Sequence, residues 1–465
     1  MAILIAGASC GDDLPPPPGL VQSGARLAVA WHVLDDGGAR VPAGLVDRAL
    51  AAPCAPEPWS DGATYCTPAD TTGTEVVFLD DACAGPVGQL LAGDDGVPPV
   101  PRYFVRHYEV GPAGARERRP SRLYRAGTAL LDEPTQVWVL DAGVCAGPRS
   151  PGVSGLPATY HALAEELTPA RVVARTEPVT AALVLDVLTG DDGLHLPVGW
   201  RDRALDVPCA LDRDGAPGAA QCVPTEAPAA SYFHDDACAE PVLAVERSGA
   251  TPPFARYRDP ATGCTATRAL GEETPAPPLF LQARGACEAV TAPTTERFHL
   301  LGAPLDLPAV TRTPAARTGR VVPLTITAGD EAPVLDDALL DTTLGTPCRI
   351  EPTGAATGVC APITDVRIVT YFADDACQVL VDLAAVPAPS CGPAPAYARA
   401  AADLPPAFHA FHAIGAIAPG PIFHKTTGER CEVFGGLPGV TLHAVGPALT
   451  TELATSTVVV DPASR

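Results

Sequence analysis

A cysteine-bearing unit occurs three times along the chain, and this repeat limits the available folds more than any other feature. Its first landmark is a short motif that consists of an Asp, a Leu and a Pro-Cys pair, in that order. The motif ends at Cys54, Cys209 and Cys348. A second cysteine follows 12 or 13 residues later, at Cys66, Cys222 and Cys360. An Asp-Asp-Ala-Cys sequence contains the third, at Cys83, Cys238 and Cys377, and the fourth stands at Cys145, Cys287 and Cys431. Order and spacing both recur, so the sequence predicts three tandem units of about 145 residues.

Each unit closes on an aromatic or apolar residue followed by His, namely His161, His299 and His443. We therefore expect a leader and Pro-rich tether over 1–23 and copies over 24–176, 179–315 and 319–461. Stretches near 166–180 and 306–322 contain Pro, Thr and Arg and are predicted to be junctions between copies.

The fold class predicted from the apolar pattern is all-β. Apolar residues alternate with period two in segments such as 26–33 and 102–108, with Asp-Gly turn signals at 36–37 and 192–193. The 53 prolines and 43 glycines disfavour long helices. Copy 1 predicts about eight strands, at 26–34, 40–47, 62–68, 74–80, 102–109, 121–130, 136–141 and 158–165. Segments 84–101, 110–120 and 211–220 are predicted to be variable loops.

Eight strands per copy fit two architectures. Three copies of two four-stranded blades would close a six-bladed propeller, which the copy size favours slightly. Alternatively, each copy forms a separate β-sandwich-like bead.

The charge balance argues against whole classes of partner. The chain has 54 acidic and 31 basic residues and a formal charge of −23. Nucleic-acid binding and docking on an anionic membrane surface both need a basic face, so neither is expected.

Fifteen cysteines without a CxxC motif are typical of an oxidising compartment. Removing Cys10 leaves an even number, and the repeat suggests one set of disulfides: Cys54–Cys66, Cys209–Cys222, Cys348–Cys360, Cys83–Cys145, Cys238–Cys287 and Cys377–Cys431. Cys264 and Cys391 would then pair across copies or stay free. Spacing alone leaves the connectivity open.

The first ten residues are a short apolar run that ends in small residues and Cys10, followed by Gly-Asp-Asp and four prolines at 15–18. This segment resembles a bacterial lipoprotein signal, which implies that Cys10 becomes a lipidated N-terminus. The repeat itself resembles the uncharacterised cysteine-rich β-repeat lipoproteins of myxobacteria, because Asp precedes Pro-Cys and an aromatic strand leads to Asp-Ala-Cys. That resemblance implies an outer-membrane or cell-surface lipoprotein, or a periplasmic or extracellular protein, and supplies no catalytic residues.

Few residues suggest chemistry. The Asp pairs at 80–81, 235–236 and 374–375 could bind calcium, but neighbouring strand residues point to opposite faces, so we expect turn-capping carboxylates instead. The repeated His161, His299 and His443 could meet around a shared axis, although half-buried strand histidines are the expected reading. His409, His412 and His424 form a local cluster that weakly suggests a metal site. Gly7-Ala8-Ser9-Cys10-Gly11 matches G-x-S-x-G, but its surroundings are not the strand and helix of a nucleophile elbow.

Two functions remain open. The first is a non-enzymatic, disulfide-stapled scaffold without a cofactor, which binds a protein, glycan or envelope polymer and touches the membrane only through its N-terminal lipid. The second is a secreted propeller or sandwich hydrolase using Asp and His. A single active site would break the repeat symmetry, and His409, His412 and His424 are the only such feature.

Overall fold

The computed structural model describes residues 21–462 except 36–38, 72–73, 92–100, 111–116, 130–133, 142, 152–157, 212–216, 260–261, 275–277, 284–285, 316–318, 328–332, 355, 388–393, 401–409, 427–429, 437–438 and 450–451. The described chain is all-β, as predicted, and its one helical element is a short 3-10 turn, η1 (Ala69–Thr71). Three repeats are evident in the strand order.

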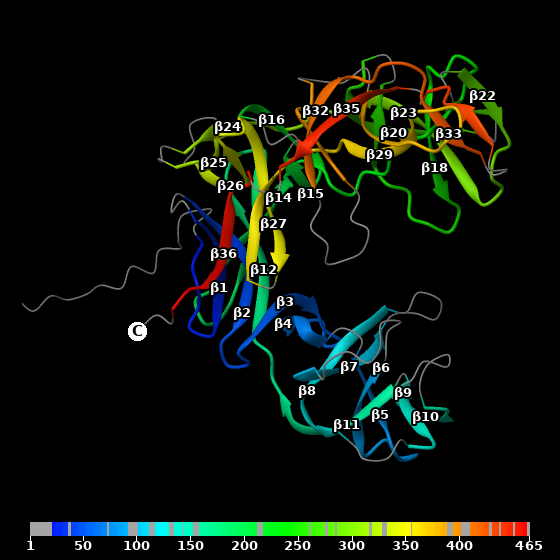
Figure 1. Ribbon diagram of the computed structural model, residues 1–465. Helices are drawn as coiled ribbons and strands as arrows, with labels where there is room; N and C mark the ends of the chain where they lie inside the picture. Colours follow the sequence, from blue (N-terminus) through cyan, green and yellow to red (C-terminus); the bar gives the residue numbers. More distant parts are fainter. Residues whose placement is uncertain are drawn as a thin grey trace, which may run out of the picture.

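Five strands from each copy build one closed barrel (Figure 1). Copy 1 supplies β1 (Leu27–Leu34), β2 (Arg40–Asp47), β3 (Ala52–Pro58), β4 (Thr64–Pro68) and β12 (Arg171–Pro178). Copy 2 supplies β13 (Leu183–Thr189), β14 (His195–Asp202), β15 (Val207–Leu211), β16 (Gly218–Pro224) and β24 (Ala309–Pro314). Copy 3 supplies β25 (Val321–Thr327), β26 (Val334–Asp341), β27 (Thr346–Gly354), β28 (Thr357–Pro362) and β36 (Thr455–Val460).

The fifth strand of each copy joins it to the next. β12 pairs with β13 and β24 with β25, and β36 returns to pair with β1, so that the barrel closes. The stretches 166–180 and 306–322, which were predicted to be junctions, contain the barrel strands β12 and β24 that connect consecutive copies. Their prolines stand at the strand ends, at Pro178 and Pro314, where the missing N–H costs little.

Between its fourth and fifth barrel strands each copy inserts a seven-stranded outer sheet. Outer sheet 1 contains β5 (Thr74–Phe78), β6 (Pro86–Leu91), β7 (Tyr103–Val110), β8 (Glu117–Ala129), β9 (Val137–Asp141), β10 (Val144–Arg149) and β11 (Ala158–Leu167). Outer sheet 2 contains β17 (Tyr232–Phe233), β18 (Pro241–Glu246), β19 (Phe254–Arg258), β20 (Thr265–Thr274), β21 (Leu279–Ala283), β22 (Ala286–Val290) and β23 (Glu296–Pro304). Outer sheet 3 contains β29 (Arg367–Phe372), β30 (Leu380–Pro387), β31 (Tyr397–Arg399), β32 (Phe411–Ile417), β33 (Phe423–Lys425), β34 (Cys431–Val433) and β35 (Val440–Ala448).

The outer sheets share one topology. Sheet 1 has the order β10-β9-β5-β6-β11-β8-β7, and sheet 2 repeats it with the corresponding strands. In sheet 3 the terminal strand β31 also pairs with β29, so that sheet rolls up and closes on itself.

The six-bladed propeller is not confirmed, since the strands form one barrel and three seven-stranded sheets rather than four-stranded blades. The alternative of one bead per copy fits better, because each copy has its own outer sheet. Copy 1 also has more strands than the eight expected, the additions being β3, β6, β10 and β12. β3 was missed because it contains three prolines. The predicted loops 84–101, 110–120 and 211–220 contain β6, the start of β8 and the start of β16.

The barrel core forms three clusters, one around each of its disulfides. Cys54 and Cys66 pack with Leu27, Val29 and other buried apolar residues. Cys209–Cys222 and Cys348–Cys360 lie in the corresponding clusters of the other copies.

Candidate functional site

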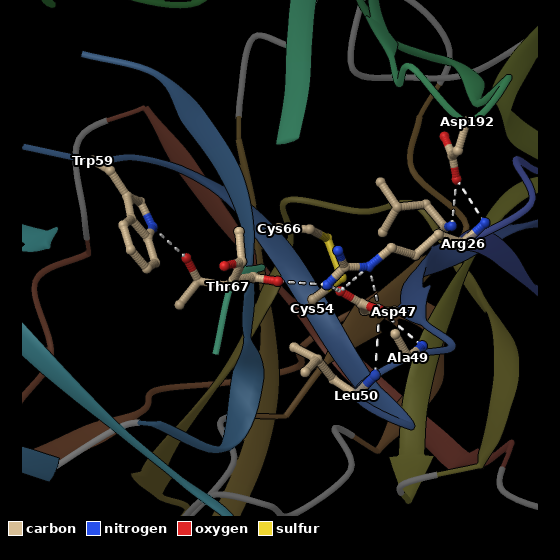
Figure 2. The surroundings of a disulfide bond; sticks show 11 residues. Arg26, Asp47, Ala49, Leu50, Cys54, Trp59, Cys66, Thr67 and Asp192 are labelled. Atoms are coloured by element: carbon tan, nitrogen blue, oxygen red, sulfur yellow. Dashed lines mark hydrogen bonds and ion pairs between the residues drawn. A yellow bond between two sulfur atoms is a disulfide. The ribbon is translucent and has the colours of Figure 1, made fainter. Parts of the chain in front are cut away.

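The Asp of the first landmark shapes a turn in every copy. Asp47 is fully buried, and its Oδ1 accepts the backbone N–H groups of Ala49 at 3.0 Å and Leu50 at 3.3 Å (Figure 2). Asp202 and Asp341 accept the N–H groups two and three residues further along in the same way. This carboxylate stabilises the turn that leads to the first Pro-Cys pair, which is a structural role.

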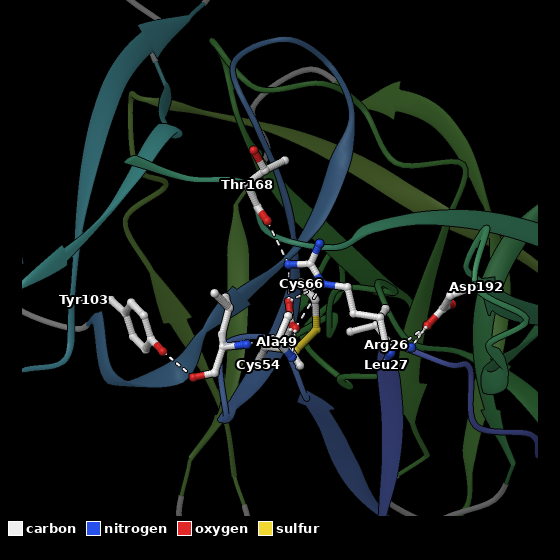
Figure 3. A network of polar contacts seen from close by, with 10 residues as sticks. Arg26, Leu27, Ala49, Cys54, Cys66, Tyr103, Thr168 and Asp192 are labelled. Carbon is white, nitrogen blue, oxygen red and sulfur yellow. Dashed lines mark hydrogen bonds and ion pairs between the residues drawn. A yellow bond between two sulfur atoms is a disulfide. The ribbon is translucent and has the colours of Figure 1, made fainter. Parts of the chain in front are cut away.

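An arginine completes the turn in two of the copies. Arg26 donates from Nε and Nη2 to the Asp47 carboxylate and from Nη2 to the Thr168 carbonyl at 2.7 Å (Figure 3). Arg320 pairs with Asp341 in the same manner. In copy 2 the equivalent position, beside the strand residue that pairs with Asp202, is Ala182.

The copies are also linked to one another through Asp192, in the turn between β13 and β14. Its Oδ2 accepts the N–H groups of Arg26 at 2.8 Å and Leu27 at 2.6 Å, at the start of copy 1 (Figure 2). A Cβ at Gly24 would lie 2.2 Å from this carboxylate, so a larger residue there would displace the Asp192 side chain. The Asp-Gly pair at 192–193, which was predicted to mark a hairpin turn, therefore also provides a contact between copies.

Six disulfides between described residues each cross-link one copy internally: Cys54–Cys66, Cys83–Cys145, Cys209–Cys222, Cys238–Cys287, Cys348–Cys360 and Cys377–Cys431. These are the six pairs suggested by the repeat. Cys264 is disulfide-bonded as well. Cys10 and Cys391 lie outside the described residues.

The first Asp of each Asp pair caps the turn before the third cysteine. Asp80 accepts the N–H groups of Ala82, Ala84 and Gly85, and these hydrogen bonds lower the pKa of its carboxyl group. Asp235 and Asp374 accept equivalent N–H groups, with pKa values lowered by the same cause. Within the described part of the chain, no group of three or more potential ligands is placed to hold a metal ion. The geometry matches the predicted turn-capping role of these carboxylates rather than calcium binding.

The repeated histidines do not meet around an axis. His161, His299 and His443 lie on β11, β23 and β35, one in each outer sheet. The Nδ1 atoms of His299 and His443 lie 3.4 and 3.0 Å from the carbonyl oxygens of Gly271 and Gly415. His299 and His443 therefore bind a neighbouring strand, whereas His161 Nε2 contacts the Thr159 hydroxyl on its own strand and its buried Nδ1 has no hydrogen-bond partner among the described residues.

A related signal was missed in the sequence, a His-x-x-Gly pattern on both strands of one pair. His412 Nδ1 lies 2.9 Å from the Gly446 carbonyl, while His443 contacts Gly415 on the opposite strand. A Cβ at Gly415 would lie 3.1 Å from the Ala444 carbonyl, so glycine allows the strands their close approach. His412 thus has a structural partner of its own.

The three-histidine cluster is not assembled from the residues described. His409 lies outside them. His412 is on β32 and His424 on β33, and β31 and β29 separate these strands in the sheet. The His424 ring packs edge-on against Phe434, with centroids 5.7 Å apart. The G-x-S-x-G match at 7–11 also falls outside the described residues.

Strands of all three copies line a cavity of about 1110 Å³, which is the candidate binding site. Its lining is rich in apolar residues, and three of them, Val198, Leu335 and Val460, are 53, 48 and 41% exposed. A volume of this size and an apolar lining are typical of ligand sites. Two carboxylates among the lining residues are already paired, Asp186 with Arg201 at 3.0 Å and Asp336 with Arg312 at 2.5 Å.

A repeated bulge helps to form this lining. The pairing register shifts opposite Ala43 in copy 1 and opposite Val198 in copy 2, each within a Pro-x-Gly sequence. The bulged residue is left out of the ladder. The signal available in the sequence was Pro42-x-Gly44 and its equivalent Pro197-x-Gly199, at the same offset from the landmark Asp.

The described residues contain no helix with the length and hydropathy needed to cross a bilayer. Their disulfides place the protein in an oxidising compartment outside the cytoplasm.

Comparison with known proteins finds no match among curated proteins and none among solved structures. A protein-family model does match, over residues 3–453. Because this match covers nearly the whole chain, the protein belongs to that family, which is described as a family of unknown function (DUF7481).

Proposed function

We propose that this is an exported cell-envelope protein, anchored by a lipid on Cys10, that acts as a non-enzymatic binding scaffold for a protein, glycan or envelope polymer. The observation that carries the proposal is the use made of the repeated polar residues. Asp47, Asp80 and their equivalents satisfy groups of the backbone in every copy, and His299 and His443 do so in copies 2 and 3. Their chemistry is committed to the fold, so the function is expected at surfaces and cavities.

The anchor and the compartment rest on separate arguments. Disulfides at matching positions in three copies favour an oxidising environment. The lipid is inferred from the signal-like segment that ends at Cys10, and from the resemblance to cysteine-rich lipoproteins of myxobacteria.

The cavity shared by the three copies is the proposed point of ligand contact. A ligand that covers these exposed apolar side chains is stabilised by about 25 cal/mol for each Å² of apolar surface removed from water. Closure of the barrel through β36 holds the lining of three copies in one arrangement. A rigid lining reduces the entropy lost on binding.

Fractionation of the native host tests the anchor. The wild-type protein is expected in the membrane fraction with a lipid adduct on the Cys10 peptide. The Cys10→Ala variant is expected to lack the adduct. Recovery of wild-type protein as an unlipidated cytoplasmic chain with free thiols would contradict both the anchor and the compartment.

Fluorescence of an apolar dye such as anilinonaphthalene sulfonate tests the cavity. Leu335→Asp introduces a negative charge that repels the dye sulfonate from the lining and should weaken dye binding by about tenfold. Leu380→Asp is the matched control, because Leu380 is 66% exposed on outer sheet 3 and does not line the cavity. Equal dye binding by both variants would remove the cavity as the site.

A further inference from the structure

A second, smaller cavity lies in outer sheet 1, and its lining differs in kind from that of the barrel. Its volume is about 280 Å³, and β5, β7, β8, β9 and β10 contribute to its walls. Five of the residues that line it are polar or charged: Glu75, Arg106, His107, Arg118 and Arg149. Three arginines around one small cavity are unexpected in a chain with a formal charge of −23.

Only one of these arginines is neutralised. Arg118 forms an ion pair with Glu75 at 2.7 Å. Arg106 is partly buried, and its Nε donates to the Ser121 hydroxyl at 3.2 Å, a neutral partner. Arg149 on β10 makes no ion pair with any described residue. Two positive charges are therefore left without a counter-charge at this cavity.

The histidine beside them supplies a further polar group. His107 Nδ1 is buried and has no hydrogen-bond partner among the described residues. Burial and the neighbouring Arg118 lower the pKa of His107, so at neutral pH its ring is uncharged and presents one N–H and one acceptor nitrogen. A buried polar atom without a partner destabilises the folded protein, and a hydrogen bond to a bound ligand would remove that cost.

The other copies do not carry these charges. Tyr103, Phe254 and Tyr397 begin the equivalent strands β7, β19 and β31. Counting three residues on from each aligns Arg106 with Tyr257 and Ala400. A Phe stands two residues before each Asp-Asp-Ala-Cys sequence, and counting back three residues from it aligns Glu75 with Ala230 and Val369. The fold is built twice without charged residues at the positions of Arg106 and Glu75, so these two charges are not needed to form an outer sheet.

We propose that the cavity of outer sheet 1 binds a phosphate-type oxyanion, held by Arg106 and Arg149 and hydrogen-bonded by His107. Guanidinium groups match the oxygens of such an anion in pairs, and partial burial strengthens the contact. The volume suits a phosphoryl group but is below the range of sites that enclose a drug-sized molecule. The anion is either free phosphate or a phosphoryl group carried by a sugar. This inference gives the proposed scaffold a ligand class, but it does not depend on the anchor.

Calorimetric titration of the purified, disulfide-intact protein tests the proposal, with inorganic phosphate and glucose 1-phosphate as probes. Saturable binding of phosphate is expected, weakened about tenfold in Arg106→Gln and in Arg149→Gln, the loss typical of one charged hydrogen bond. Arg125→Gln is the matched control, because Arg125 belongs to the same sheet but is paired with Glu165 at 2.6 Å. Tighter binding of glucose 1-phosphate than of phosphate would identify the sugar-borne group as the ligand.

Two results would overturn the proposal: no saturable binding of either probe at millimolar concentration, or equal weakening by all three substitutions. Arg149 is exposed, so its variant is expected to fold even if Arg106→Gln does not. The titration is made on detached protein, so its failure would leave the Cys10 anchor untouched. Conversely, an unlipidated protein that binds phosphate would refute the anchor alone.

Discussion

At the scale of single residues, buried carboxylates stabilise the turn that leads to the first Pro-Cys pair of each copy. Asp47, Asp202 and Asp341 are 0 or 1% exposed, and each holds two backbone N–H groups of one turn. The copies differ in the cation that accompanies the carboxylate, since copy 2 has Ala182 where the others have Arg26 and Arg320. The same carboxylate should therefore contribute differently to stability in different copies.

Replacing Asp47 by Ala should destabilise the protein by about 3 kcal/mol, because it leaves two N–H groups and the Arg26 guanidinium without their partner. Asp202→Ala loses only the N–H contacts and should cost about 1–2 kcal/mol. Chemical denaturation of both variants measures the difference. Equal losses would mean that Arg26 contributes nothing to the turn.

The Asp80 turn should be sensitive to acid. Its pKa is lowered below the ordinary value of 3.8 by backbone hydrogen bonds, first that from Ala84. A depressed pKa in the folded state contributes stability above pH 3.8 that is lost as the pH falls through the folded value. The protection factor of the Gly85 amide, which corrects for the intrinsic pH dependence of exchange, should fall in that acidic range. Asp80→Asn should lower it at neutral pH, whereas Asp81→Asn is the control and should not.

At the scale of elements, the outer sheets depend on glycines where two strands come unusually close. A Cβ at Gly127 would lie 2.6 Å from the Ala162 carbonyl, and the equivalent distances at Gly271 and Gly415 are 2.9 and 3.1 Å. Real Cβ atoms essentially never come within 3.0 Å of another atom, so the backbone of the first two pairs would have to shift.

Gly127→Ala should therefore lower the free energy of unfolding by about 1–3 kcal/mol, the cost of an overpacked contact. Gly415→Ala should cost less, because its neighbour needs to move only slightly. Gly435→Ala serves as the control, since nothing lies within 4 Å of its added Cβ. Thermal unfolding followed by circular dichroism ranks the three, and a control as damaging as Gly127→Ala would show that contact distance does not decide the effect.

At the scale of the whole molecule, the barrel is closed by its two most distant strands. Val460 of β36 pairs with Ala30 of β1, and β36 also pairs with β28. Polar contacts reinforce this closure, for example Ser23 Oγ donating to Asp461 at 2.8 Å. Closure leaves the barrel without an exposed edge strand.

A chain truncated after residue 453 should lose this closure. Hydrogen exchange should increase over β1 and β28, whose partner is removed, and the protein should aggregate more readily through the two open edges. Outer sheets 1 and 2 should keep their protection. A chain ending at Pro462 is the control, and unchanged exchange in the shorter chain would show that β36 is dispensable.

The all-β class and the threefold repeat can be predicted from the sequence, because each depends on local periodicity or on fixed spacing, whereas the repeat suggests one set of disulfides without fixing their connectivity. Alternation of apolar residues predicts strands, and cysteines recurring in the same order predict equivalent bridges. The turn-capping role of Asp80 could also be anticipated, since side-chain bonds to nearby N–H groups are local.

How the copies combine depends on strand pairing between distant parts of the chain. Pairing of β36 with β1 joins residues more than 400 positions apart, and no local pattern specifies such a partner. The same holds for the two cavities, whose walls come from several strands. Arg106 and Arg149 are 43 residues apart and meet at one cavity only because sheet 1 brings β7 and β10 together around it. Local patterns specify strands and turns, whereas strand partners and cavity walls depend on long-range packing.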